Sequence, residues 1–459
     1  MENEALLEKF RTLADESNFR ELSVYLDDQL ITDIAELIHE LPEDAGAIIN
    51  HLSIGRAAAA FRILEFPQQE DVIRSLSAAK IAELMNELPA DDRTAFLEEL
   101  PSEAVKELIK LLDPEERKIT LSLLGYRENS VGRIMTPDYI AVREEWTVGQ
   151  VLNYIREYGK DSETIDVIYV IDDKGRLLDD FRIREFLLVS PDTVVHTLMD
   201  DRFVTLHAND DQEEAIQVFR MENRVALPVV DDQGILLGIV TIDDMLWIAN
   251  EEHTEDIQKI GGTEALDEPY LDMPLLKLVK KRAGWLVVLF IGEMLTATAM
   301  AFFEDEIAKA VVLALFVPLI ISSGGNSGSQ ASTLIIQAMA LGEITLSDWW
   351  RVMRREISSG LLLGSILGII GFTRIMLWNA IKPTTYGPHA PLIGATVGVS
   401  LVGVVLWGTL SGSMLPLILK KLGADPATSS APFVATLVDV TGLLIYFSVA
   451  FAFMRGILL

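Results

Sequence analysis

The chain has 459 residues, of which 50% are hydrophobic, and its formal net charge is −31 at pH 7. A chain of this length exceeds what one hydrophobic core usually supports, so we expect several domains. The acidic excess argues against nucleic acid as a partner, because phosphate binding needs clustered Lys and Arg, and the absence of cysteine excludes disulfides and thiolate metal sites.

The negative charge is concentrated in the first part of the chain. Residues 1–275 hold 25 basic and 60 acidic residues, whereas residues 276–459 hold 13 and 9. Bound divalent cations would relieve the repulsion within so acidic a region, although ordinary solubility explains an acidic surface equally well. The stretch MENEALLEKF at the start lacks a basic segment followed by an apolar one. We therefore predict no signal peptide and a cytoplasmic location for the acidic part.

Residues 1–128 are predicted to form an all-helical, superhelical N-domain. Leu, Ile and Ala recur at spacings of three and four, which is the helical period. Proline-containing motifs separate the apolar stretches, and Pro suits the first turn of a helix: ELPED at 40, EFPQQ at 65, ELPAD at 87, ELPSE at 99 and LLDPE at 111. Spacings near 12 and 24 residues indicate short helices that bury their apolar faces only by stacking. Such a domain is typical of a binding or regulatory scaffold.

Residues 129–250 contain two copies of one α/β template. The copies begin at VGRIMTPDYIAV (131–142) and HTLMDDRFVTLH (196–207), and each continues with a helix, a strand, a turn and a closing helix. This arrangement resembles a tandem pair of CBS domains, which implies a pseudo-symmetric pair that often binds adenine nucleotides. In the second copy, Thr241 and Asp244 fall where the family's ribose contacts would lie. In the first copy, the polar stretch 179–182 and Glu185 depart from the family's pattern, which argues against a nucleotide in that half.

Residues 251–281, beginning near NEEHTEDIQKIGG, are predicted to form an acidic connector helix. Residues 282–459 are predicted to form an all-helical transmembrane domain, so the whole chain is a multi-domain membrane protein. Five apolar stretches are each long enough to cross about 30 Å of hydrocarbon: 283–303, 311–341, 357–378, 391–419 and 431–454. The second and fourth are overlong, so we expect them to be bent, interrupted or tilted, with Pro318 and the SSGGNSG patch (322–328) breaking the second.

The distribution of basic residues predicts the orientation of these spans. Nine lie at the ends that face the side of the N-terminus: Lys277, Lys280, Lys281, Arg282, Arg351, Arg354, Arg355, Lys420 and Lys421. Four lie at the opposite ends: Lys309, Arg374, Lys382 and Arg455. Because cytoplasmic loops carry the excess of Lys and Arg, we expect a cytoplasmic N-terminus and a C-terminus outside.

Asp439 lies inside the apolar run ATLVDVTGLLIYF (435–447). A carboxylate at the centre of a membrane span costs roughly 2.5 to 3.5 kcal/mol, so it is a candidate functional residue, and contact with a neighbouring helix or with interfacial water is the alternative. Span two adds Asn326, Gln330 and the hydroxyls of Ser322, Ser323, Ser327 and Ser329, for which small-residue helix packing is the alternative. Mg²⁺ takes oxygen ligands and keeps several waters. One Asp per subunit, facing its mate across a two-fold axis, would form a carboxylate ring suited to a hydrated cation.

Three membrane stretches resemble the signatures of the MgtE-type magnesium channel family: 322–344, which begins SSGGNSGSQAS; 399–427, which ends KKLGADPA; and 432–447, PFVATLVDVTGLLIYF. The order of the parts also matches: helical N-domain, CBS pair, connector, five spans. The resemblance implies a homodimer in the plasma membrane with a central pore. It also implies that Mg²⁺ bound among the cytoplasmic domains holds the connector, or plug helix, in a closed position.

The resemblance assigns roles to individual residues. The pore carboxylate corresponds to Asp439 and the span-two amide to Asn326, with Ala435 lining the same path one turn before Asp439. The regulatory Mg²⁺ positions correspond to Asp91, Asp92, Asp244, Glu252, Glu255 and Asp256. For each of these six, a solvated acidic surface is the alternative. Independently of the resemblance, acidic surfaces that pack only with cations between them would close as free Mg²⁺ rises.

Some positions depart from the family. Asn223 and Trp247 stand where carboxylates of the sensor are expected. Glu293 in span one is also unusual, either as a second ion contact or as a residue on the dimer side that pairs with a polar neighbour such as Thr296. We favour the second interpretation.

The predicted function is a Mg²⁺-selective, Mg²⁺-gated channel or transporter in the inner membrane of a bacterium, embedded in lipid. No catalytic constellation appears among the six scattered histidines, and no Gly-Lys phosphate motif is present, so an enzyme is not expected. One alternative is a membrane-anchored CBS protein that senses adenine nucleotides, but an anchor needs no intramembrane Asp. Two others are a broader divalent-cation transporter and an anion or osmolyte transporter, of which the last would place Lys or Arg deep in the spans.

Overall fold

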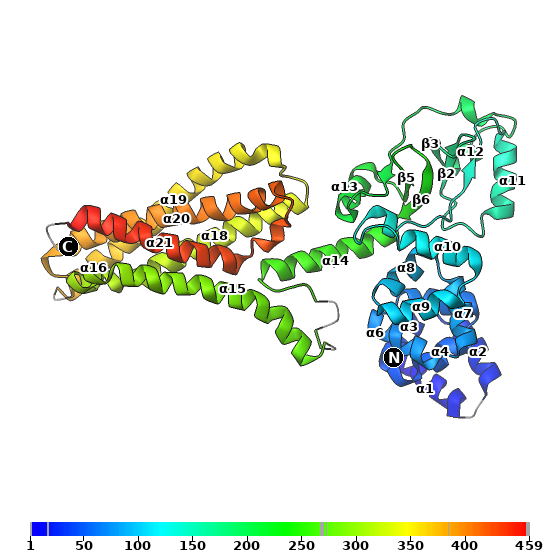
Figure 1. Ribbon diagram of the computed structural model, residues 1–459, viewed down its shortest axis with the longest axis horizontal. Coiled ribbons are helices and arrows are strands. Elements are labelled where there is room, and N and C mark those ends of the chain that lie inside the picture. Colours follow the sequence, from blue (N-terminus) through cyan, green and yellow to red (C-terminus); the bar gives the residue numbers. More distant parts are fainter. Residues whose placement is uncertain (1, 16–17, 267–269, 272, 384, 456–459) are drawn as a thin grey trace. The chain divides into compact units, whose positions relative to one another are not determined.

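The structure is a computed structural model that describes residues 2–15, 18–266, 270–271, 273–383 and 385–455. The chain divides into two compact units, Met1–Asn250 and Glu251–Leu459 (Figure 1). The predicted fold class is confirmed: a helical N-domain precedes two small α/β modules, and five long apolar helices follow.

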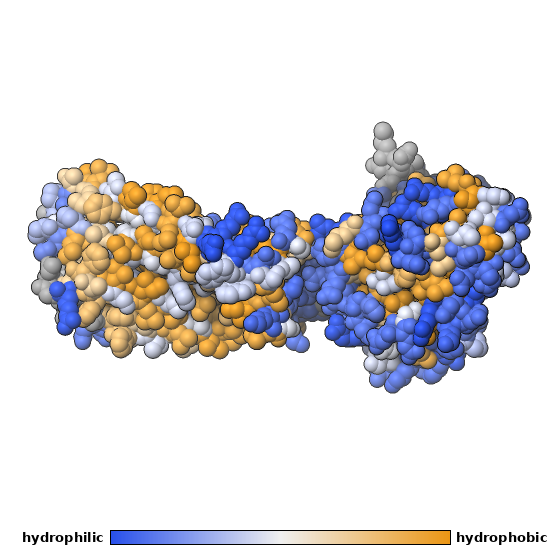
Figure 2. All heavy atoms as spheres, turned by 90° about the horizontal axis from the view of Figure 1, so that it is seen from above, coloured by the Kyte–Doolittle hydropathy of each residue, from blue (hydrophilic) through white to orange (hydrophobic). Residues whose placement is uncertain are grey.

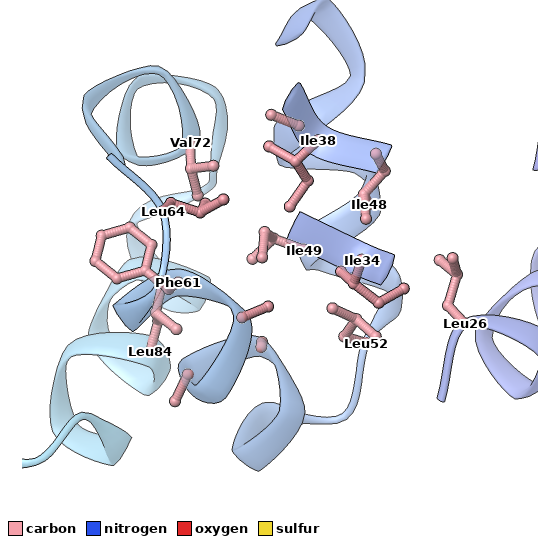
Figure 3. Packing of buried hydrophobic residues seen from close by; sticks show 14 of the residues in the cluster. Leu26, Ile34, Ile38, Ile48, Ile49, Leu52, Phe61, Leu64, Val72 and Leu84 are labelled. Carbon is pink, nitrogen blue, oxygen red and sulfur yellow. The ribbon is translucent and has the colours of Figure 1, made fainter. Parts of the chain in front are cut away.

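The N-domain consists of short helices that stack in chain order. Most contact the helix two positions further along, as α3 does with α5, α4 with α6 and α5 with α7. Their apolar faces form one core that includes Ile34, Ile48 and Phe61 (Figure 3). Helices this short are marginal alone, so their stability comes from this shared core. The bounds are α1 Glu2–Asp15, α2 Phe19–Asp27, α3 Ile31–Glu40, α4 Ala45–His51, α5 Ile54–Arg62, α6 Phe66–Ser75, α7 Ala78–Glu87, α8 Ala90–Glu98, α9 Ser102–Leu111 and α10 Pro114–Leu123.

The two α/β modules repeat one topology. In each, a short strand pairs in parallel with a second strand, which pairs antiparallel with a third, in the orders β1-β2-β3 and β4-β5-β6. The turns DDKG and DDQG place Gly175 and Gly234 at φ values of 80° and 78°, which glycine adopts without strain. The bounds are β1 Ala141–Val142, α11 Val148–Tyr158, β2 Val167–Ile171, β3 Leu177–Arg182, α12 Ile183–Leu187, β4 Leu206–His207, α13 Gln212–Glu222, β5 Ala226–Val230 and β6 Leu236–Thr241.

The connector predicted over 251–281 is divided in the structure. Its acidic part belongs to α14, which starts at Ile242, directly after β6, and ends at Ile260. No Gly or Pro interrupts that stretch, so the helix continues from the α/β module, and it stops before Gly262, whose φ is 75°. Its basic part belongs to α15, which begins at Leu275.

Five helical segments in the described residues are long and apolar enough to cross a membrane, as predicted: Leu275–Phe302, Val311–Ala340, Leu346–Ile381, Gly387–Lys421 and Ala431–Met454. They include α15 Leu275–Phe302, α18 Val317–Ala340, α19 Trp349–Ile381, α20 Ala390–Lys421 and α21 Ala431–Met454, with the short helices α16 Glu304–Lys309 and α17 Val311–Ala314 between α15 and α18. Apolar residues cover much of the surface of this unit (Figure 2). The second unit is therefore membrane-embedded.

The predicted interruption of span two at SSGGNSG is wrong. The break lies earlier, between α17 and α18, and the patch is helical throughout. Pro318 stands in the first turn of α18, where its missing N–H has no partner to lose. The glycines of the patch serve the packing between helices instead.

Glycines let α18 and α20 approach at backbone distance. A Cβ atom added at Gly412 would lie 2.1 Å from the carbonyl oxygen of Gly328, and one at Gly408 would lie 2.4 Å from that of Gly324. The glycines of the two pairs are four residues apart on each helix, so the close contact extends over two turns. In a membrane, such close packing replaces the hydrophobic effect as the force between helices.

We predict that Gly412→Ala destabilises the membrane unit by at least about 2 kcal/mol, because a methyl group there requires α18 and α20 to separate. Gly403→Ala is the matched control on the same helix, since its Cβ would meet only the Cγ2 of Ile445, at 3.2 Å. Thermal unfolding in detergent measures both variants, and equal melting temperatures would contradict the prediction.

Candidate functional site

Asp439 lies half-buried on α21, facing α18. Its Oδ1 is 3.7 Å from the position that a Cβ of Gly325 would occupy, and the Cβ of Ala435 is 3.4 Å from the same position. Ala435 and Asp439 therefore lie one turn apart on the same face of α21, and both are next to Gly325 of α18. Ser329 fastens the start of α21 to α18, since its Oγ donates to the carbonyl of Ala431 at 2.9 Å.

Helix α15 brings a second carboxyl group to Asp439. The Nε1 of Trp285 donates to the Oγ of Ser430 at 2.9 Å, and a Cβ at Gly292 would lie 2.6 Å from the Cγ2 of Thr436, so α15 packs closely on α21. In this position the carboxyl group of Glu293 lies close enough to that of Asp439 to interact with it. Two carboxyl groups in contact need a proton or a cation between them.

Of the polar neighbours considered for Glu293, the structure selects Asp439 and not Thr296. The hydroxyl of Thr296 is buried without a hydrogen-bond partner, while Glu293 contacts Asp439. The sequence could not decide this, because the pairing depends on which face of α15 packs against α21.

Asn326 is exposed on α18, next to the buried Gly325. Its Nδ2 is 3.5 Å from the Oγ of Ser322, and Gln330 and Gln337 are exposed further along the helix. A depression in the surface is lined by Ser329, Gln330, Thr333 and Leu334. Polar side chains within a membrane span face water or another protein surface rather than lipid. This face of α18 is therefore suited to line a wet path or to meet a second subunit.

A second acidic site lies in the first unit, where the N-domain meets the α/β modules. Asp91 is buried in α8, and Asp92 lies 3.0 Å from Arg62, measured from Oδ2 to Nε. The Oδ1 of Asp244 is 3.7 Å from Nη2 of the same arginine, and its Oδ2 accepts a 2.5 Å hydrogen bond from the hydroxyl of Thr241. The structure thus brings together three of the six residues assigned to the sensor.

The electrostatics of this site favour bound protons or cations. Burial, together with Asp244 and Glu163, raises the pKa of Asp92 to about 7, although Arg62 opposes the shift. Burial and the neighbouring Asp92 raise the pKa of Asp91, and the Oδ1 of Asp91 has no hydrogen-bond partner. Carboxylates in this state gain from any cation that reaches them.

Sequence reasoning missed three members of this acidic site: Arg62, Glu163 and Asp243. Arg62 ends α5, and Glu163 lies in the loop between α11 and β2, so neither stands in a motif that points to the site. Only Asp243 had a signal, its adjacency to Asp244. Among the described residues, no three His, Asp or Glu side chains are grouped as a ligand set. An ion here would keep much of its water, as Mg²⁺ does.

The three predicted sensor residues on α14, namely Glu252, Glu255 and Asp256, belong to the second unit. Lys259 forms ion pairs with Glu255 and with Asp425, the latter at 2.7 Å. Burial raises the pKa of Asp256 to about 6, with Asp425 as the next cause. Here a lysine already compensates part of the negative charge.

The departures from the family's pattern have structural explanations in part. Asn223 ends α13 in the left-handed conformation, with φ 50° and ψ 45°, which Asn tolerates better than most residues. Asp180 forms a 2.6 Å ion pair with Arg224 of the second module, and Asp179 accepts hydrogen bonds from the backbone after α12. The polar residues in the first copy therefore hold the two modules together. Nothing in the structure explains Trp247.

These features define a polytopic membrane protein whose N-terminal unit pairs a helical domain with tandem CBS modules. Family models match the same parts: the MgtE intracellular N domain at residues 30–129, CBS domains at 131–192 and 195–250, and the MgtE divalent cation transporter domain at 317–449.

Whole-chain similarity agrees with these matches. The chain is 37% identical to the magnesium transporter MgtE of Thermus thermophilus over 92% of this chain and 95% of the relative. It is 27% identical to the Bacillus subtilis protein of the same name, over 100% and 99%. A crystal structure of the cytosolic domain of the Mg²⁺ channel MgtE in complex with ATP matches 53% of this chain and 99% of its own, with 33% identity and a TM-score of 0.51. The chain belongs to the MgtE family of divalent cation transporters.

We predict that acidification stabilises the first unit when no divalent ion is present. The folded pKa of Asp92 is about 7, above its usual value, so its contribution is full below about pH 4 and is lost as the pH rises through 7. In EDTA, the free energy of unfolding should fall between pH 5 and 8, and Asp92→Asn should reduce that fall by about 1 kcal/mol. Thermal unfolding of the full chain measures it. Asp71→Asn, at an exposed position on α6, should keep the wild-type slope, and an unchanged slope in Asp92→Asn would contradict the prediction.

Proposed function

We propose that this chain conducts Mg²⁺ across the plasma membrane as a homodimer and is closed by Mg²⁺ that binds its cytoplasmic acidic residues. One observation carries the proposal: Asp439 lies within an apolar span, close to a second carboxyl group on α15 and on the same face of α21 as Ala435. The relatives named as magnesium transporters, one at 37% identity, support Mg²⁺ as the transported ion.

The proposed path suits a hydrated divalent cation. Asp439 supplies negative charge at a point that water-bound Mg²⁺ can contact through hydrogen bonds, and Asn326 offers an amide oxygen on the neighbouring helix. Glu293 adds a second negative group per subunit, which deepens the attraction for cations and the exclusion of anions. Conduction also requires that the ion leave again, and indirect contact through its waters keeps the binding weak enough.

A homodimer is supported by the faces that a single chain leaves uncovered. Asn326, Gln330 and Gln337 are exposed on α18 although this helix lies in the membrane, and α15 is the least buried of the five spans in the described residues. A second copy packed on this face would cover the amides and place two Asp439 side chains around one axis. Nine basic residues on one side against four on the other support a cytoplasmic N-terminus in the inner membrane.

For regulation, we propose that Mg²⁺ binds the acidic residues of the N-domain, the second CBS module and α14, namely Asp91, Asp92, Asp244, Glu252, Glu255 and Asp256. Burial of Asp91 with an unpaired oxygen supports a cation there. Ions that bind the closed state more tightly shift the equilibrium toward it as free Mg²⁺ rises. At low Mg²⁺ concentration the sites are empty, so the carboxylates repel each other and the pathway opens.

ATP at the CBS pair is a further proposal, supported by the ATP in the related cytosolic domain. Thr241 and Asp244 are the candidate contacts, and they are hydrogen-bonded to each other in this structure. A role as a nucleotide sensor with a passive anchor is disfavoured, because an anchor gains nothing from the pair formed by Asp439 and Glu293.

We predict that Asp439→Ala reduces Mg²⁺ flux into liposomes at least about tenfold at every cytoplasmic Mg²⁺ concentration, because the ion loses its carboxylate contact. Wild-type flux should fall as Mg²⁺ on the cytoplasmic face rises. Glu356→Gln, which removes another carboxylate from a membrane span, is the matched control and should conduct like wild type. Wild-type flux in Asp439→Ala would assign Asp439 a structural role.

We predict that Glu293→Gln lowers Mg²⁺ flux by about three- to tenfold, because it removes one of two negative groups from the path while preserving the shape of the side chain. Thr296→Val, one turn along α15, should leave the flux unchanged. If Glu293→Gln conducts like wild type, Glu293 is not part of the ion path.

A further inference from the structure

Arg62 lies among four carboxylates that come from three separate segments. Its Nε is 3.0 Å from Asp92, and its Nη atoms lie 3.7 Å from Asp244, 3.9 Å from Glu163 and 4.0 Å from Asp243. Arg62 and Asp92 belong to the N-domain, Glu163 to the first CBS module and the other two to the start of α14, after the second module. One guanidinium thus connects the N-domain with both modules.

The charge of this guanidinium does not depend on solution conditions. Arginine stays protonated at every physiological pH, and its five donors can serve several carboxylates at once. The side chain is 27% exposed, so its ion pairs are shielded from water more than surface pairs are. Arg62 therefore offsets part of the repulsion among these carboxylates whether or not a divalent ion is present.

The compensation is incomplete, which leaves a need for further cations. One positive charge faces four carboxylates, and a fifth, Asp91, is buried beside Asp92 with an unpaired oxygen. Arg62 can therefore hold the domains together partly, and a bound divalent ion would neutralise more of the remaining negative charge.

We propose that Arg62 is a built-in cation of the sensor, which holds the N-domain against the CBS pair in the absence of divalent ions and lowers the Mg²⁺ concentration needed for full closure. This inference rests on the proposed gating for its second half only. Its first half concerns a contact within the first unit and holds or fails without any Mg²⁺.

The test follows the distance between the N-domain and the first CBS module in the full chain. The chain has no cysteine, so Lys106→Cys on α9 and Asn153→Cys on α11, both exposed, accept spin labels at known positions. Pulsed electron resonance on labelled chains diluted with unlabelled chains gives the distance in EDTA and across a Mg²⁺ titration. The variants are Arg62→Gln, Arg62→Lys and Arg56→Gln.

We expect wild type in EDTA to populate the short distance substantially and Arg62→Gln to lose most of it. The Mg²⁺ midpoint of Arg62→Gln should rise at least about threefold, as the loss of several partly shielded ion pairs predicts. Arg62→Lys, which keeps the charge without the planar fork, should be intermediate. Arg56→Gln removes an arginine from the same helix that pairs with Asp27 inside the N-domain, and it should behave as wild type.

Two results would overturn the inference: equal distances in EDTA for wild type and Arg62→Gln, or a lower Mg²⁺ midpoint in Arg62→Gln, which would mean that Arg62 competes with the ion. Failure of the proposed gating has a different signature. In that case Mg²⁺ changes the distance in neither protein, while the comparison in EDTA still decides the role of Arg62.

Discussion

The cost of an uncompensated carboxylate in a poorly hydrated place governs both sites of this molecule. In the membrane unit, Asp439 and Glu293 touch within an apolar surrounding. In the first unit, Asp91 and Asp92 are removed from water beside Asp244. In each case the protein has placed negative charge where water cannot fully stabilise it, and a cation is the group that restores the balance. In the proposed mechanism, the transported ion and the regulatory ion are therefore both attracted by carboxylates that water stabilises poorly.

The membrane unit places its carboxylates by close packing of small residues. The glycines of α18 and α20 bring two helix backbones together, and Gly325 and Gly292 do the same for the surroundings of α21. The outer face of α18 leaves the amides of Asn326, Gln330 and Gln337 exposed, and in the proposed homodimer a second chain would cover them.

In the first unit, positively charged side chains neutralise part of the negative charge of the carboxylates. Arg62 faces the acidic residues between the N-domain and the CBS modules, and Arg224 neutralises Asp180 between the modules themselves. In the second unit Lys259 does the same for Glu255 and Asp425. Fixed positive side chains set how much attraction remains for ions from solution, so in the proposed sensor they would adjust the Mg²⁺ affinity without being ligands. The Mg²⁺ sensitivity of such an arrangement would depend on a small difference between the repulsion among the carboxylates and their attraction to cations.

The sequence by itself determined the order of the parts, because each has its own period: short helices separated by prolines, a repeated α/β template, and five runs long enough to span hydrocarbon. It also determined that Asp439 and Asn326 are exceptional, since charge and amides are costly in such runs. Tertiary structure alone decided that Glu293 meets Asp439, that the SSGGNSG patch is a packing surface, and that Arg62 and Glu163 join the acidic site. These outcomes depend on which faces of distant helices meet. The local periodicity and composition of the sequence do not specify that packing.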